Sequence, residues 1–129
     1  MPARKEPASA REVVLAWLPA VLYMALIFTL SSMPALAPYA KYVPLRDKGL
    51  HFLEYAVLGF LTTHASGRTF PDRTRARVVI FGWLTAVLFG VSDELHQAFV
   101  PGRTAELADL FADAIGAAVG TGIRAFIRR

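Results

Sequence analysis

Acidic and imidazole side chains stand at helical spacing near the middle of this sequence. Asp47, His51, Glu54 and Tyr55 occupy positions i, i+4, i+7 and i+8, which a helix places on one face. Such a face brings a carboxylate and an imidazole together, and this is the pair that general acid–base catalysis uses. His51 and Glu54 are also one turn apart, as ligands are in carboxylate-bridged metal bundles.

A second group of these side chains lies farther along the chain. Asp93 is about one helical turn from His96 and Gln97, while Glu94 is rotated by about 100° on the same helix. We expect acid–base chemistry to be carried by Asp93, Glu94, His96 and His51, with one of the two carboxylates as the base. The pair Asp93 and His96 would be the second half of a two-helix metal site.

A third, purely acidic group follows a Pro-Gly turn. Glu106, Asp109 and Asp113 stand at i, i+3 and i+7. Asp113 lies about 6 Å deeper along the helix axis than Asp109, at 1.5 Å per residue, so it is the costliest to leave unpaired. Arg103 directly follows the turn, where its guanidinium can make a bidentate contact with a phosphate or carboxylate.

Side chains around the acid–base group are expected to contact a substrate. Ser92 is a weak nucleophile candidate because a hydroxyl on a helix lacks the exposed turn that acyl transfer uses. The expected contacts are Lys48, Glu54, Tyr55, Ser92, Gln97, Arg103, Asp109 and Asp113. No resident metal or other cofactor is expected, because Lys48 and Arg103 would compete for the same carboxylates; the metal site remains the alternative.

Four segments have the character of membrane spans. Residues 13–30 hold 18 positions without a formal charge, close to the roughly 20 that cross a bilayer. Residues 78–98 are equally apolar up to position 91 and then become charged, while residues 49–65 and 107–123 contain His, Asp or Glu. A soluble bundle would carry a Lys- and Arg-rich face on each helix, and these four segments contain neither residue. The sequence therefore predicts an all-α, four-helix transmembrane bundle in which residues 1–129 form a single domain.

The composition excludes several classes of protein. Of the 129 residues, 55% are hydrophobic and 19% are charged, which disfavours a disordered or ordinary hydrophilic chain. There is no cysteine, so disulfides, thiolate metal sites and thiol nucleophiles are excluded. The net charge of +4 is not accompanied by an aromatic and basic binding motif, so nucleic acid is not an expected partner.

The basic residues instead predict the orientation in the membrane. Ten of the Lys and Arg residues lie in the amino-terminal tail, the second loop and the carboxyl end, and four lie in the first and third loops. By the positive-inside rule, both termini, including the tail of residues 1–12, should be cytoplasmic, with the helices in the plasma (inner) membrane. The acidic and imidazole groups would then share one layer at the outer face.

Three stretches resemble the VanZ-like family, and together they cover most of the chain. They are DKGLHFLEY (47–55), SDELHQAFVPGR (92–103) and ELADLFADAIGAAVG (106–120). The resemblance implies a small bacterial membrane protein, and the family's namesake is associated with reduced sensitivity to the glycopeptide teicoplanin. Members commonly have Asn where this chain has Asp113, which places a further acid in the site. The resemblance implies no established reaction.

Three functions fit a polar layer at the outer face, and the sequence leaves them open. The first is an enzyme acting on an envelope lipid headgroup, a peptidoglycan precursor or a glycopeptide. The second is binding or transport without bond chemistry, and transport through four short helices would require a homo-oligomer. The third is structural, with salt bridges holding the helix ends together. The expected partners are membrane lipids and a lipid-linked or glycopeptide ligand.

Overall fold

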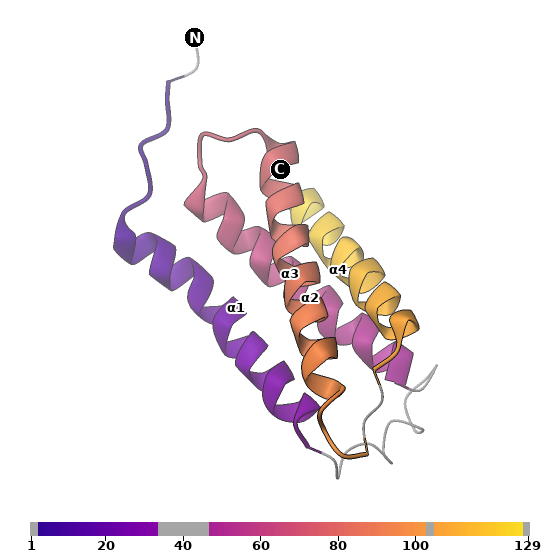
Figure 1. Cartoon of the computed structure of the whole chain (residues 1–129). Coiled ribbons are helices and arrows are strands. Elements are labelled where there is room, and N and C mark those ends of the chain that lie inside the picture. Colours follow the sequence, from indigo (N-terminus) through magenta and orange to yellow (C-terminus); the bar gives the residue numbers. More distant parts are fainter. Residues whose placement is uncertain (1–2, 34–46, 103–104, 128–129) are drawn as a thin grey trace.

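The chain folds into four helices. The computed structural model describes residues 3–33, 47–102 and 105–127, apart from the side chain of Asp47. The helices are α1 (Ala10–Ser31), α2 (Asp47–Thr69), α3 (Arg75–Gln97) and α4 (Leu107–Ile127) (Figure 1). No strand occurs within the described ranges. The predicted all-α, four-helix architecture is confirmed.

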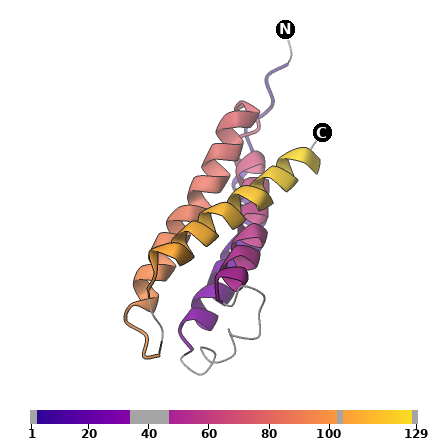
Figure 2. The same cartoon turned by 90° about the vertical axis from the view of Figure 1, so that its right-hand side faces the viewer.

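Successive helices alternate in direction, so chemically different loops gather at the two ends of the bundle. The start of α1, the α2–α3 connection and the end of α4 lie at one end, at the top of both views (Figures 1 and 2). We call this the arginine end, after Arg68, Arg73, Arg75, Arg77 and Arg124. The opposite end, where α1 and α3 finish and α2 and α4 begin, is called the polar end.

Short polar side chains set where two of the helices begin. Ser9 accepts a hydrogen bond from the Glu12 backbone N–H at 3.2 Å, and the Glu12 carboxylate accepts one from the Ser9 N–H at 2.8 Å. This capping box satisfies two N–H groups that have no partner within α1. Thr74 caps α3 by accepting from the Arg77 N–H at 3.4 Å. After α3, Gly102 has φ of 79°, a conformation that favours glycine, in the turn toward α4.

Three of the helices can span a membrane by their length and composition. These are α1, α3 and α4, with 22, 23 and 21 residues. Large apolar side chains on their outer surfaces are exposed, among them Leu22, Leu88 and Phe126, as contact with lipid requires. The sequence predicted four spans, whereas α2 is long enough at 23 residues but too polar to qualify by composition.

The polarity of α2 is explained by its place in the bundle. It packs against each of the other three helices, and most extensively against α4. Its buried hydroxyls bond to neighbouring helices: Thr62 donates to the Gly82 carbonyl at 2.7 Å and Ser66 to the Val78 carbonyl at 3.0 Å. Because neighbouring helices satisfy these groups, α2 does not need the apolar surface that lipid contact demands.

Glycines let α2 and α4 approach at backbone distance. A Cβ atom at Gly116 would overlap the Phe52 carbonyl, and one at Gly120 would overlap the Ala56 carbonyl. On α2, a Cβ at Gly59 would strike the backbone of Ala117. This close crossing fixes the rotation of both helices, and therefore the direction of the polar side chains that each carries at the polar end.

We expect Gly116→Ala to lower the free energy of unfolding by about 2 kcal/mol, because the added methyl forces α2 and α4 apart. The measurement is thermal unfolding in detergent, followed by circular dichroism. Gly122→Ala is the matched control on the same helix, since a Cβ there meets nothing within 4 Å. Equal melting temperatures for the two variants would contradict the proposed role of the crossing.

Candidate functional site

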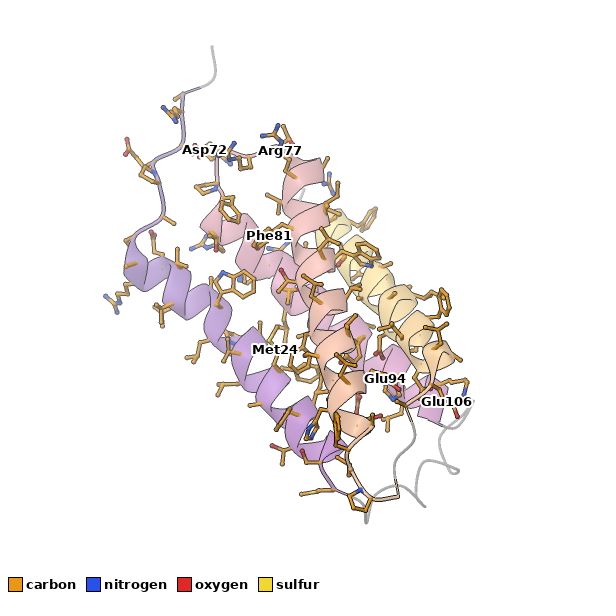
Figure 3. The ribbon with its side chains drawn as sticks, viewed as in Figure 1. Met24, Asp72, Arg77, Phe81, Glu94 and Glu106 are labelled. Atoms are coloured by element: carbon orange, nitrogen blue, oxygen red, sulfur yellow. The ribbon has the colours of Figure 1, made fainter. Side chains whose placement is uncertain are left out.

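All four helices contribute side chains to one cluster at the polar end. Glu94, at the end of α3, and Glu106, just before α4, lie near each other there, while Asp72 and Arg77 lie at the opposite end (Figure 3). We define the polar cluster by ten residues, which are Ser31, Ser32, Lys48, His51, Asp93, Glu94, His96, Glu106, Asp109 and Asp113. Four of its carboxylates are buried, and none of these is more than 8% exposed.

A short hydrogen bond between α2 and α4 forms the centre of the cluster. His51 Nδ1 lies 2.7 Å from Asp113 Oδ1, and both side chains are buried. Because an ionised carboxylate can only accept, Nδ1 carries the hydrogen and donates it. The second ring nitrogen, Nε2, then faces Asp109 Oδ2 at 4.0 Å. The ring is thus held in one orientation between two carboxylates of α4.

Glu94 joins α3 to the start of α4. Its Oε1 accepts a hydrogen bond from the Glu106 backbone N–H at 2.6 Å. The Glu106 carboxylate lies 3.0 Å from Lys48 Nζ, and the same ammonium is 3.8 Å from Asp109 Oδ1. Lys48 therefore lies at the solvent-facing edge of the carboxylates, with 43% of its side chain exposed.

The last turn of α1 completes the other side of the cluster. Ser31 donates to Asp93 Oδ2 at 3.0 Å. Ser32 donates to the Phe28 carbonyl, so its oxygen accepts from His96 Nε2, 2.7 Å away. The His96 ring is stacked on Phe28 with the ring centroids 4.2 Å apart. Each residue of the Asp93 and His96 pair is thus oriented by a serine of α1.

Tyr55 is completely buried, and its ring is stacked near that of His51 with the centroids 6.4 Å apart. A small residue on α3 makes room for it, because a Cβ at Gly90 would lie 3.1 Å from the Tyr55 ring and 3.2 Å from Asp113 Oδ2. Gly90 therefore allows the phenol and the deepest carboxylate to lie against α3.

Not every predicted site residue lies in the cluster. Ser92 is exposed and donates to the carbonyl of Phe89 in its own helix at 2.7 Å, so it does not face the buried carboxylates. Glu54 is half-buried on α2, and Gln97 is buried at the end of α3. Arg103 lies outside the described residues, and so does the side chain of Asp47.

Sequence reasoning missed the contribution of α1. It identified three helix ends, whereas Ser31, Ser32 and Phe28 add a fourth. The available signal was the Ser-Ser pair at the carboxyl end of the first apolar run, which the predicted topology places in the same layer as Asp93 and His96.

The structure brings together a different set of possible metal ligands from the pairs, one helical turn apart, that the sequence suggested. His51, Glu94 and Asp109, from three helices, bring a nitrogen and two carboxylate oxygens within 4.8 Å of one another. The sequence predicted no metal, and its alternative paired His51 with Glu54 and Asp93 with His96. Of the four residues in that alternative, the described group keeps only His51. Its other two ligands are Glu94 and Asp109.

Comparison with known proteins decides the family. The family model for VanZ/LLP1 matches residues 15–128, which include all of α2, α3 and α4 and most of α1. The chain belongs to the VanZ/LLP1 family. No curated protein and no solved structure matches it. Together with its apolar helices, membership makes the chain an integral membrane protein of the VanZ-like type.

We expect His51→Leu to lower the free energy of unfolding of this VanZ-like protein by about 3 kcal/mol, because Asp109 and Asp113 lose the group between them. Asp113→Asn keeps an acceptor for His51 Nδ1 and should change the stability by less than about 1 kcal/mol. Thermal unfolding in detergent measures both. If Asp113→Asn lowered the free energy of unfolding more than His51→Leu, the charge of Asp113, and not its role as a hydrogen-bond acceptor, would be what stabilises the contact with His51.

Proposed function

We propose that this VanZ-like protein binds the polar headgroup of an envelope lipid or of a lipid-linked cell-wall precursor at its polar end. The observation that supports the proposal is the excess of buried carboxylates. Asp93, Glu94, Asp109 and Asp113 are buried, whereas the cations among the described residues of the cluster are Lys48 and the two histidines. Charged groups inside a membrane protein are costly and usually mark a functional site.

A purely structural role explains this arrangement less well. Apolar side chains of similar volume would hold the helix ends together without the cost of desolvating four carboxylates. Among the buried carboxylate oxygens, Glu94 Oε2 and Asp113 Oδ2 have no hydrogen bond to any described residue. Groups kept in this state are expected to meet a ligand rather than to strengthen the bundle.

The sequence predicts that Lys48 and Arg103 bind a phosphate or carboxylate of the ligand. The described contacts of Lys48 refine this prediction. Its ammonium already pairs with Glu106 and Asp109 at the edge of the cluster. A headgroup that binds here therefore has to replace these ion pairs with contacts from its own charged groups. A peptidoglycan precursor or a glycopeptide such as teicoplanin would approach the same edge, and the family resemblance makes both suitable test ligands.

The binding test uses the protein in detergent, with native mass spectrometry as the measurement. The probes are phosphatidylethanolamine, phosphatidylglycerol, a lipid-linked peptidoglycan precursor and teicoplanin. We expect at least one probe to bind, and Glu94→Ala combined with Asp109→Ala to reduce its bound fraction at least about tenfold, equivalent to about 1.4 kcal/mol. Arg73→Ala at the arginine end is the control. Equal binding of every probe to the double variant and the control would contradict the proposal.

The thermal stability of neutral variants distinguishes a binding site from a purely structural cluster. Neutral isosteres at a binding site commonly leave a protein as stable or more stable, because functional groups are retained at a cost in stability. Asp93→Asn and Glu94→Gln should therefore keep or raise the melting temperature in the absence of ligand. A salt-bridge role predicts a lower melting temperature for both variants. Retention of affinity by Asp93→Asn and His96→Gln would further favour binding over acid–base catalysis.

We also propose that the polar end faces the outside of the plasma membrane, with both termini cytoplasmic. The supporting observation is the concentration of arginines at the opposite end of the bundle, as the positive-inside rule requires of a cytoplasmic face. Because the chain has no cysteine, a single introduced cysteine is an unambiguous reporter. Ala105 and Arg73 are exposed positions at the two ends.

In intact cells, we expect a membrane-impermeant maleimide to label Ala105→Cys but not Arg73→Cys. Permeabilising the cells should make Arg73→Cys reactive, which controls for its accessibility. The reverse pattern would place the polar cluster at the cytoplasmic face, where lipid-linked precursors on the outer leaflet could not reach it.

A further inference from the structure

We propose that His51, Glu94 and Asp109 bind a divalent metal ion, with Asp113 as the positioning residue behind His51. The three ligands come from α2, α3 and α4, and their ligand atoms lie within 4.8 Å of one another. Atoms that each lie about 2.0–2.2 Å from one ion are about 3–4.3 Å apart. An ion at the centre therefore needs only small side-chain movements.

The orientation of His51 is that of a metal ligand. Metal-binding histidines usually donate their second ring N–H to a carboxylate, which fixes both tautomer and ring direction. His51 Nδ1 donates to Asp113 Oδ1 at 2.7 Å in this way. The remaining nitrogen, Nε2, consequently carries a lone pair and points toward Asp109, whose Oδ2 is 4.0 Å away. That separation is too long for a direct hydrogen bond, but it suits two ligands of one ion.

Glu94 supplies an independent indication that a cation binds here. The residue is 8% exposed, and its Oε2 is buried without a hydrogen bond to any described residue. Its other oxygen, Oε1, is satisfied by the Glu106 backbone N–H. One oxygen of Glu94 lies within 4.8 Å of ligand atoms of His51 and Asp109. A carboxylate with one oxygen bonded and the other buried without a hydrogen bond to a described residue is poorly compensated by hydrogen bonds alone.

Lys48 does not fill this position. Its ammonium lies 3.8 Å from Asp109 Oδ1 and 3.0 Å from Glu106, whereas Asp109 turns its other oxygen, Oδ2, toward His51. The two oxygens of Asp109 therefore face different neighbours. Lys48 neutralises charge at the exposed edge, and Asp109 Oδ2 stays directed at His51.

A protonated His51 between Asp109 and Asp113 is the competing explanation. That imidazolium would satisfy the two aspartates, but it leaves Glu94 Oε2 without a hydrogen bond to a described residue. A metal ion accounts for all three side chains at once. The metal site is therefore the more complete description of these contacts.

The donor set selects the kind of ion. One imidazole nitrogen and two carboxylates suit Zn²⁺ or Mn²⁺, whereas Mg²⁺ and Ca²⁺ favour oxygen ligands alone. Three protein ligands leave coordination positions open for water or for a headgroup oxygen. This inference deepens the proposed function, and it rests on that function for the step in which the ion contacts a phosphate or carboxylate of the bound headgroup.

The test measures binding of Mn²⁺ and Zn²⁺ to the full chain, purified in detergent and stripped with a chelator that is then removed. Electron paramagnetic resonance of free Mn²⁺ gives the stoichiometry, and Zn²⁺ is used in competition. We expect one ion per chain, and an increase in the dissociation constant of about 100-fold or more in Glu94→Gln and in Asp109→Asn. Asp72→Asn is the control, because this carboxylate is exposed and lies at the opposite end of the bundle from the ligand set.

The positioning role of Asp113 has its own readout. Electron spin echo modulation of bound Mn²⁺ should show a directly coordinated nitrogen, and His51→Gln should abolish it. Asp113→Leu should weaken binding by about 10–100-fold. Asp113→Asn keeps an acceptor for Nδ1, so it should restore most of the affinity together with the nitrogen signal. Circular dichroism confirms that each variant is folded before it is compared.

Two results would overturn the inference. One is the absence of stoichiometric Mn²⁺ or Zn²⁺ binding to the folded, unmodified chain. The other is equal affinity in Glu94→Gln and Asp72→Asn, which would indicate surface binding only. The proposed function fails separately: stoichiometric metal binding without binding of any headgroup probe refutes only the headgroup proposal, and headgroup binding to a chain that binds no metal refutes only the metal site.

Discussion

The cost of burying carboxylates is the constraint on which the rest of the structure depends. Asp109 and Asp113 lie inside a bundle whose outer surface is apolar, so they have no access to the solvent that would stabilise their charge. Their stabilisation has to come from other helices. His51 reaches them from α2, and the backbone glycines at the α2–α4 crossing hold that helix close enough for the contact.

The same constraint explains the unequal roles of the helices. A helix that faces lipid needs apolar side chains around most of its circumference, and α1 meets this requirement with no charged residue between Glu12 and its carboxyl end. Only its last turn is polar, where Ser31 and Ser32 bond Asp93 and His96. The polar residues of α2 are tolerated because this helix packs against all three other helices. On α3 and α4, exposed apolar side chains and buried site carboxylates occur on the same helix.

Hydropathy and helical periodicity predicted the helices and the shared layer of polar residues, because both depend mainly on position along the chain. They could not predict which side chains of that layer touch. Ser92 is adjacent to Asp93, yet one step of helical rotation leaves it exposed. His51 and Glu54 have the spacing of metal ligands, but the carboxylate that approaches His51 from α3 is Glu94. Such contacts depend on the rotation of each helix about its axis, which is set by backbone packing at Gly59, Gly116 and Gly120 and is not encoded in spacing along one helix.

Asp113 shows that hydrogen bonding and charge make separate contributions in this cluster. An asparagine, which the family resemblance suggests is common here, would offer the same acceptor to His51 Nδ1 and keep the ring oriented. The aspartate of this chain adds a buried negative charge without adding an acceptor that the ring requires. Gly90 accommodates its second oxygen at close range but supplies no positive group. The added charge therefore increases the attraction of the whole cluster for a cation. The residue that orients the imidazole also sets part of the charge around the proposed ion site at Glu94 and Asp109.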